Sequence, residues 1–257
     1  MHRRIAAVVF ACAIACAGQS SAQTSEERAA ARALIAKHGD AIVTVLGSGK
    51  IRITQGGREM QNRDERIRAI ATVLDPSGLA VMALSVLDPG DLMAGTLSRG
   101  RPVGAPQVSV STEATDLRFR MADGKEIPVR VVLRDKDLDL AFLRPVDPPA
   151  TPMAQVAGAS GKAAAIDLLV VLTRLFEVAN WQVSASFASV VAVVEKPRTF
   201  YLLTSGAFGA PVFDPQGRFV GIVVRLRSDD DQGTAGAPPI VLPADDVREV
   251  AKQASGK

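Results

Sequence analysis

Histidines and cysteines, the side chains best suited to act as a base near neutral pH or as a thiol nucleophile, are few. Among 257 residues there are two histidines, His2 and His38, and two cysteines, Cys12 and Cys16. A serine hydroxyl attacks a carbonyl only when a neighbouring base takes its proton. Histidine fills that role most often, because its pKa lies close to neutral pH. The positions of these few side chains therefore limit the hydrolytic chemistry that the chain can perform.

Candidate ligands for a metal or a phosphate-bearing cofactor are also scarce. Asp229–Asp231 is an acidic run, but it lacks the supporting pattern of a calcium loop, and a solvated loop is the simpler interpretation. No glycine-rich phosphate loop occurs along the chain. We therefore expect no cofactor and no metal site.

The first 22 residues have the order of parts found in a secretory signal. Met1–Arg4 is positively charged, Ile5–Ala17 is apolar but too short to span a bilayer, and Gly18–Ala22 is small and polar. We expect cleavage after this segment and an exported protein, either periplasmic or secreted. Two alternatives stay open: a retained membrane anchor, or lipid attachment at Cys16, because Ala13–Cys16 resembles a lipoprotein box.

Cleavage would change the chemistry available to the chain. Both cysteines and His2 would leave with the signal, so the remaining chain would have no thiol for disulfides, catalysis or metal binding. Arg3 and Arg4 would leave without any acidic residue, which takes the formal net charge from +3 to +1. A charge so close to neutral gives no reason to expect a nucleic-acid partner. We expect membrane contact only if Cys16 carries a lipid.

Three short turn motifs divide β-branched runs along the rest of the chain. Asp75–Gly78 has proline second and glycine fourth, which suits a tight turn, and Asp214–Gly217 repeats this arrangement. Ala122–Lys125 is a third turn, with Asp123 and Gly124 at its centre. Each turn lies between two apolar runs and therefore predicts a β-hairpin. Several hairpins at this spacing are typical of an all-β sandwich or barrel.

The residues around these turns resemble the catalytic motifs of HtrA/DegP-type serine proteases, which have a trypsin-like fold. In that family an Asp-Pro-x-Gly turn leads into an apolar strand that ends at the catalytic histidine, and Ser85 stands at that place here. A second hairpin leads to an Asp-Leu-Ala run whose aspartate orients the histidine, and Asp139 falls on that position. Thr204–Val212 resembles the Gly-Asn/Asp-Ser-Gly-Gly-Pro nucleophile motif, with Phe208 at the place of the serine. Gly206, Ala207 and Phe208 would then be the remnant of the oxyanion loop.

The resemblance spans residues 41–253 and implies an all-β fold of two packed antiparallel β-barrels. Barrel one would cover about 40–148 and barrel two about 153–253, and no PDZ domain is expected after them. A helix is expected at 23–39, because Thr24 and Glu27 form a capping box, and another at the C-terminus, where Val247 and Val250 have helical spacing.

The same resemblance argues against catalysis. Phenylalanine at 208 has no nucleophilic atom, and serine at 85 cannot accept a proton near neutral pH. His38 is expected on the surface of the leading helix, away from these positions. The chain is thus interpreted as a pseudoprotease, an exported binding or scaffold module that takes a peptide or protein at the cleft between the barrels. The sequence does not decide whether Phe208 plugs that cleft or anchors a ligand.

Two other functions remain open. The first is a divergent, active endopeptidase whose catalytic residues have moved, which would require Ser85 or Ser205 to lie next to His38. The second is a structural partner of an active protease or envelope complex, docking through apolar surface at Leu168–Val178 with Trp181 nearby. An ordinary core strand is the simpler interpretation of Leu168–Val178.

Overall fold

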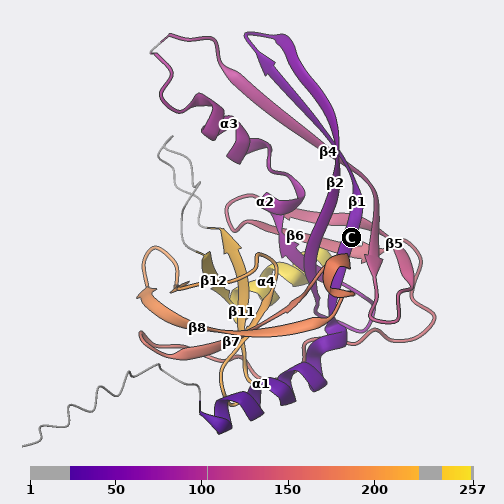
Figure 1. Cartoon of the computed structure of the whole chain (residues 1–257), viewed down its shortest axis with the longest axis vertical. Coiled ribbons are helices and arrows are strands. Elements are labelled where there is room, and N and C mark those ends of the chain that lie inside the picture. The colour runs from indigo at the N-terminus through magenta and orange to yellow at the C-terminus, as the bar shows by residue number, and fades with distance from the viewer. Residues whose placement is uncertain (1–23, 103, 226–238, 256–257) are drawn as a thin grey trace, which may run out of the picture.

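The protein folds into two closed, six-stranded antiparallel β-barrels with a helix at each end of the described chain (Figure 1). The computed structural model describes residues 24–102, 104–225 and 239–255. The all-β, two-barrel architecture expected from the resemblance is therefore confirmed. The expected signal peptide with Cys16 and the acidic run Asp229–Asp231 lie outside the described residues.

Barrel one has the strand order β1-β2-β3-β6-β5-β4, and barrel two the order β10-β11-β12-β9-β8-β7. The strands of barrel one are β1 Ile42–Gln55, β2 Arg58–Val73, β3 Ala80–Ala83, β4 Val108–Arg120, β5 Glu126–Asp135 and β6 Leu140–Pro145. Those of barrel two are β7 Leu168–Arg174, β8 Val183–Val194, β9 Phe200–Leu203, β10 Pro211–Phe213, β11 Phe219–Arg225 and β12 Pro239–Pro243. The helices are α1 Ser25–His38, α2 Leu84–Leu87, α3 Gly90–Ser98 and α4 Ala244–Ser255, with 3₁₀ turns η1 Gly39–Ala41 and η2 Glu177–Ala179. None of the described helices is long and apolar enough to cross a membrane.

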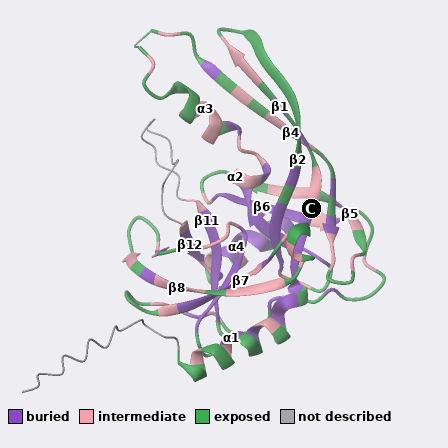
Figure 2. Ribbon diagram, in the orientation of Figure 1, coloured by how far each residue is buried: buried purple, intermediate pink, exposed green. Residues whose placement is uncertain are grey.

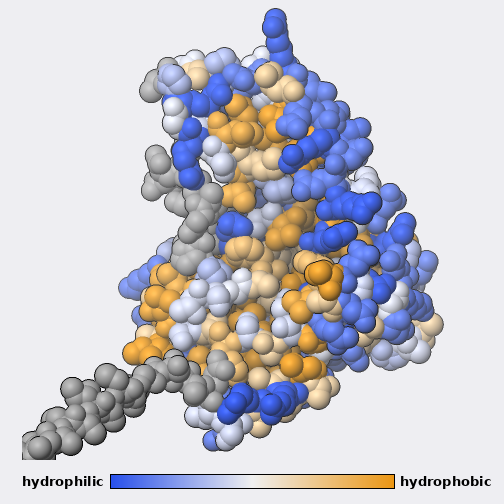
Figure 3. Space-filling view, viewed as in Figure 1, coloured by the Kyte–Doolittle hydropathy of each residue, from blue (hydrophilic) through white to orange (hydrophobic). Residues whose placement is uncertain are grey.

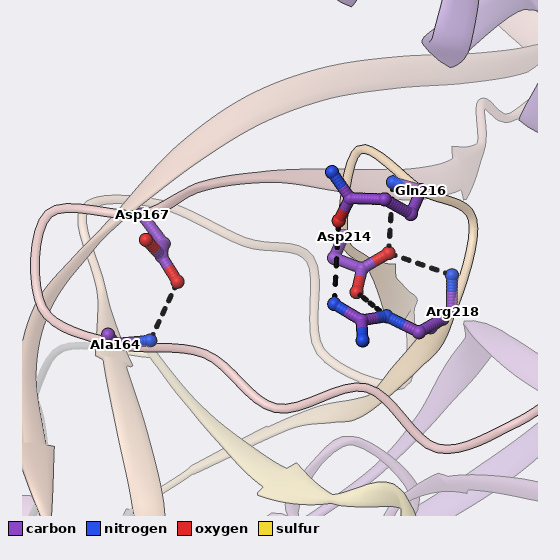
Figure 4. Close-up of polar contacts among 5 residues, drawn as sticks. All are labelled: Ala164, Asp167, Asp214, Gln216 and Arg218. Atoms are coloured by element: carbon purple, nitrogen blue, oxygen red, sulfur yellow. Dashed lines mark hydrogen bonds and ion pairs between the residues drawn. The ribbon is translucent and has the colours of Figure 1, made fainter.

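The predicted hairpin turns form because their aspartates bind the backbone of the same turn. Asp75 Oδ1 accepts hydrogen bonds from Ser77 N at 2.8 Å and Leu79 N at 3.2 Å. In the turn between β10 and β11, Asp214 Oδ1 accepts from Gln216 N at 3.1 Å and from Arg218 N at 2.8 Å (Figure 4). Such bonds hold the chain in the reversed conformation without help from distant residues.

Successive side chains of a strand point to opposite faces, and this alternation separates three apolar clusters. On β1, Val43 and Val45 point into barrel one, whereas Ile42 on the opposite face joins a cluster shared with barrel two. A third cluster fills barrel two. Figure 2 shows the buried residues gathered in the two barrels. Both faces of β1 are buried at its start, so this strand takes part in the contact between the barrels.

The α1 helix begins with the predicted capping box. Glu27 N donates to Thr24 Oγ1 at 3.1 Å, and Thr24 N donates to Glu27 Oε2 at 2.7 Å. The expectation of a surface His38 at the other end is wrong. Its side chain is only 1% exposed, and its ring stacks on Phe213 with ring centroids 4.8 Å apart. The last turn of α1 packs onto barrel two, which helical spacing alone could not show.

The first two strands run far beyond barrel one. None of the three turns predicted from the sequence falls within residues 47–66, yet β1 and β2 pair from Ile42↔Thr72 to Gln55↔Arg58. We call the part outside the barrel the arm: residues 48–66 of the β1–β2 hairpin and 108–115 of β4. Its distal β2 residues are exposed and mostly polar, which hides the apolar alternation of a strand (Figure 2). Figure 3 shows hydrophilic residues along the outer side of the arm.

A buried arginine ties the barrels together. Arg174, at the end of β7, donates to Ile42 O at 2.6 Å, Gly39 O at 2.7 Å and Trp181 O at 2.9 Å. Burial lowers its pKa, and the negative charge of Asp40 opposes that effect. Within β7, the residues from Leu169 to Leu172 are buried, which confirms the core-strand interpretation of that part. Beyond the strand, Leu175 and Val178 are exposed.

Candidate functional site

The three residues singled out by the sequence lie at the junction of the barrels. Ser85 belongs to α2, the single helical turn that follows β3. Asp139 lies in the turn between β5 and β6, with a left-handed φ of 55°. Phe208 lies in the loop between β9 and β10 of barrel two. Ser85 and Asp139 lie within two residues of a strand, and Phe208 lies in a loop that two strands hold at its ends, so the barrel scaffold positions all three.

The carboxylate of Asp139 is buried and fully engaged. Oδ1 accepts from Ser85 N at 2.6 Å, and Oδ2 accepts from Ser85 Oγ at 3.0 Å and from Arg225 N at 2.8 Å. Burial raises the pKa of Asp139, and the backbone N–H groups of Arg225 and Ser85, the Ser85 hydroxyl and the charge of Arg225 act in the opposite direction. The two motif positions Ser85 and Asp139 are therefore in direct contact, although 54 residues separate them. Because Arg225 belongs to β11, this carboxylate also links the two barrels.

The ring of Phe208 is half-buried and packs against the apolar cluster of barrel two. The guanidinium of Arg225 lies over it, 4.3 Å from the ring centroid, in a cation–π arrangement. One residue, Arg225, therefore contacts both Asp139 through its backbone and Phe208 through its side chain. No sequence motif predicts this role, because Arg225 is simply the last residue of the apolar strand β11.

The backbone around Phe208 is held by both barrels. Gly209 N donates to Val223 O at 2.8 Å, and Gly209 O accepts from the buried Thr72 Oγ1 at 3.0 Å. Gly209 has φ +86°, and a β-carbon there would lie 2.3 Å from Ile70 O of barrel one. Only glycine fits such a position. The motif Gly206–Pro211 contains the signal for this glycine, but the partners Thr72 and Ile70 come from a distant strand.

A family model describing a trypsin-like peptidase domain matches residues 72–222, which include Ser85, Asp139 and Phe208. The chain belongs to this family. No curated protein shows significant similarity to the chain.

The trypsin-like domain also resembles solved structures of an HtrA-type protease. AlgW with a decapeptide has a TM-score of 0.55 and 14% identity, over 88% of this chain and 67% of that chain. A substituted AlgW with a decapeptide has a TM-score of 0.55 and 14% identity, over 86% of this chain and 65% of that chain. AlgW with a tripeptide has a TM-score of 0.53 and 15% identity, over 86% of this chain and 62% of that chain. The chain thus spans about two thirds of the AlgW chain, and at these identities the likeness shows the fold.

The trypsin-like domain does not bring His38 to this site. In the Ser-His-Asp arrangement of active members, an imidazole lies between the carboxylate and the nucleophile. Here the Ser85 hydroxyl donates directly to Asp139, and His38, the last residue of α1, stacks on Phe213 of barrel two. Ser205 is exposed on the loop before Phe208. Within the described ranges, no group of three His, Cys, Asp or Glu residues is placed to hold a metal ion.

Proposed function

We propose that this chain is a catalytically inactive member of the trypsin-like peptidase family that binds an extended peptide or protein segment between its barrels. The observation that carries the proposal is the direct Ser85–Asp139 hydrogen bond, which Arg225 links to Phe208. It leaves the place of a general base filled by a hydroxyl and the place of the nucleophile filled by an aromatic ring.

The chemistry supports inactivity at two separate steps. A serine hydroxyl cannot take a proton from a nucleophile near pH 7, and the Phe208 ring offers no atom that could form an acyl-enzyme. The buried His38 is held away from this site by its contact with Phe213. The relocated-residue alternative would require His38 beside Ser85 or Ser205, and the geometry gives it no support.

Peptide binding is supported by the retained scaffold. The AlgW structures of the same fold contain a decapeptide or a tripeptide. An extended peptide can add to an exposed strand edge through main-chain hydrogen bonds, which needs no catalytic side chain. The half-buried Phe208 would supply apolar contact area next to such a peptide. The secretory signal expected at residues 1–22 supports export, and the partner would then be met outside the cytoplasm.

The first test is labelling of the purified protein with a fluorophosphonate serine-hydrolase probe, beside a casein cleavage assay. An active HtrA-type protease is the positive control, and we expect neither labelling nor cleavage by this chain. Labelling that disappears when Ser85 or Ser205 alone is changed to alanine would overturn the proposal and identify the nucleophile. Labelling that survives both changes would overturn it as well.

A further inference from the structure

The α1 helix rests on barrel two through one narrow face. The helix lies along β7 and β8 (Figure 1). Its buried residues are Ala31, Leu34 and His38, and the partly buried Ile35 packs beside them. Their spacing of three and four residues places all four on the same side of the helix. The other residues of α1 are exposed or only partly buried (Figure 2).

Polar side chains do not fasten α1 to the barrels. Within the described parts of the chain, the side-chain hydrogen bonds of Thr24, Glu27 and Arg28 all stay inside the helix and its cap, and no ion pair joins the helix to a barrel strand. A segment held by few apolar contacts belongs to the least stable part of a protein, and it can open while the rest stays folded. The attachment of α1 therefore depends on its four-residue face.

His38 is the only titratable residue of that face. Its side chain is 1% exposed and stacks on Phe213. Neither ring nitrogen makes a hydrogen bond with any described residue. A neutral ring tolerates this apolar contact, but a protonated ring would be a buried charge with two donors that lack acceptors. Protonation of His38 therefore opposes the attachment of α1.

The positive charges near His38 add to this opposition. Lys37 is its neighbour in α1, and the guanidinium of Arg174 in β7 donates to Gly39 O at 2.7 Å. Burial lowers the pKa of His38 and the charge of Lys37 lowers it further, whereas the nearby Gln155 backbone raises it. The docked helix therefore favours the neutral ring.

The negative charges near His38 are engaged elsewhere. Asp40 is exposed, and its charge acts on the buried Arg174. Asp214 follows Phe213, but its carboxylate is held by Arg218 and by the backbone of its own turn (Figure 4). Residues 183–186 at the start of β8 and residues 153–157 around Gln155 carry no charge. None of these elements supplies a free counter-ion for a protonated ring.

The same arginine limits how far an opening can spread. Arg174 donates to Gly39 O and also to Ile42 O, at 2.6 Å. A guanidinium stays charged throughout the range in which histidine titrates, so both bonds persist when His38 is protonated. Opening should therefore end at Gly39, and β1 should keep its place in barrel one.

We propose that protonation of His38 releases α1 from barrel two at acidic pH, while both barrels stay folded. Release would uncover the Phe213 ring and the apolar residues around it. This inference does not depend on the peptide-binding function. The released ring has the ordinary pKa of about 6.5, so the opening constant of α1 should rise about thirtyfold between pH 7.5 and pH 5.0 if the docked ring stays neutral.

The test is hydrogen exchange of the purified protein at pH 7.5 and pH 5.0, followed by mass spectrometry. Each exchange rate is divided by the intrinsic rate at the same pH, which gives a protection factor. We expect the protection of residues 25–38 to fall about 10–30-fold at pH 5.0, and that of α4 to change by less than about twofold. His38→Phe keeps a ring on Phe213 without a titrating group, so α1 should be equally protected at both pH values. His38→Gln, which is also neutral, gives the same comparison if the phenylalanine variant does not fold.

Leu34→Ala is the matched control, because Leu34 belongs to the same buried face but binds no proton. It should lower the protection of α1 at both pH values and keep the ratio between them. Equal protection of α1 at both pH values in the wild-type protein overturns the proposal. An unchanged pH response in the neutral variants overturns it too, and so does a joint loss of protection in α1 and α4, which would mean unfolding of the whole protein.

Discussion

At the scale of single residues, Asp139 is the group whose environment is most sharply defined. It is 1% exposed, yet its carboxylate receives three hydrogen bonds. Two of the donors are backbone N–H groups, so their positions follow from the fold and not from the side chains at 85 and 225. Only the Ser85 hydroxyl depends on residue type. The aspartate can therefore stay satisfied when its neighbours change, at a modest cost.

Substitution of Ser85 by alanine measures that cost. Ser85→Ala removes the donor to Oδ2 and should lower the free energy of unfolding by about 1–2 kcal/mol at pH 7. The loss should shrink as the pH falls through the raised pKa of Asp139, because the hydroxyl stabilises the ionised carboxylate. Urea denaturation at pH 7 and pH 4 measures both values, with Ser111→Ala on the exposed arm as the control. Unchanged stability at pH 7 would show that the hydroxyl contributes nothing.

At the scale of elements, the sequence predicted what is held by local contacts. The Asp75–Gly78 and Asp214–Gly217 turns contain their own hydrogen-bond acceptors, and α1 contains its own cap, so each could be read from a few residues. The arm could not be predicted from a few residues, because residues 58–66 are exposed, mostly polar and held as a strand only by pairing with β1. At the candidate site, Ser85 and Asp139 followed from motifs, whereas the contact of Arg225 with Phe208 depends on tertiary packing.

The α1 helix depends on a histidine that must stay neutral. Burial lowers the pKa of His38, the charge of Lys37 lowers it further, and the Gln155 backbone opposes them weakly. Its pKa is therefore lower in the folded protein than the ordinary value of about 6.5 in the unfolded chain. As the pH falls, the unfolded chain binds this proton first. The contribution of His38 to stability is full above about pH 6.5 and is lost as the pH falls through the folded pKa.

His38→Phe should remove this pH dependence while keeping a ring stacked on Phe213. Thermal melts from pH 7.5 to 4.5 compare the two proteins, and both lose the same contributions from carboxylates. We expect the wild-type melting temperature to fall more steeply than that of the variant below about pH 6.5. Parallel curves would mean that His38 is protonated equally easily in the folded and unfolded states.

At the scale of the whole molecule, the two barrels are joined by polar contacts as well as by the shared apolar cluster. Arg174 of barrel two binds carbonyl groups at the start of barrel one, Asp139 of barrel one binds the backbone of β11, and Thr72 binds the loop at Gly209. All three contacts lie in buried or half-buried surroundings. The relative placement of the barrels, and with it the shape of the candidate site, is therefore fixed from both sides of the junction.

The Arg174 contact can be tested by Arg174→Met, which keeps an apolar stem but leaves three carbonyl groups without their donor. We expect a loss of about 3–5 kcal/mol in the free energy of unfolding, because buried acceptors without partners are costly. Urea denaturation gives the value, and Arg134→Met, at an exposed position, serves as the control. A variant as stable as the control would mean that the shared apolar cluster alone holds the two barrels together.

Gly209 has a consequence for how this loop can change over generations. The residue must be glycine because the backbone of barrel one leaves no space for a β-carbon, whatever stands at position 208. The two neighbours are therefore under separate constraints. Residue 209 must stay glycine for folding, whereas residue 208 can be exchanged according to the function of the protein. A lineage can lose or regain a reactive side chain at 208 without rebuilding the backbone that presents it.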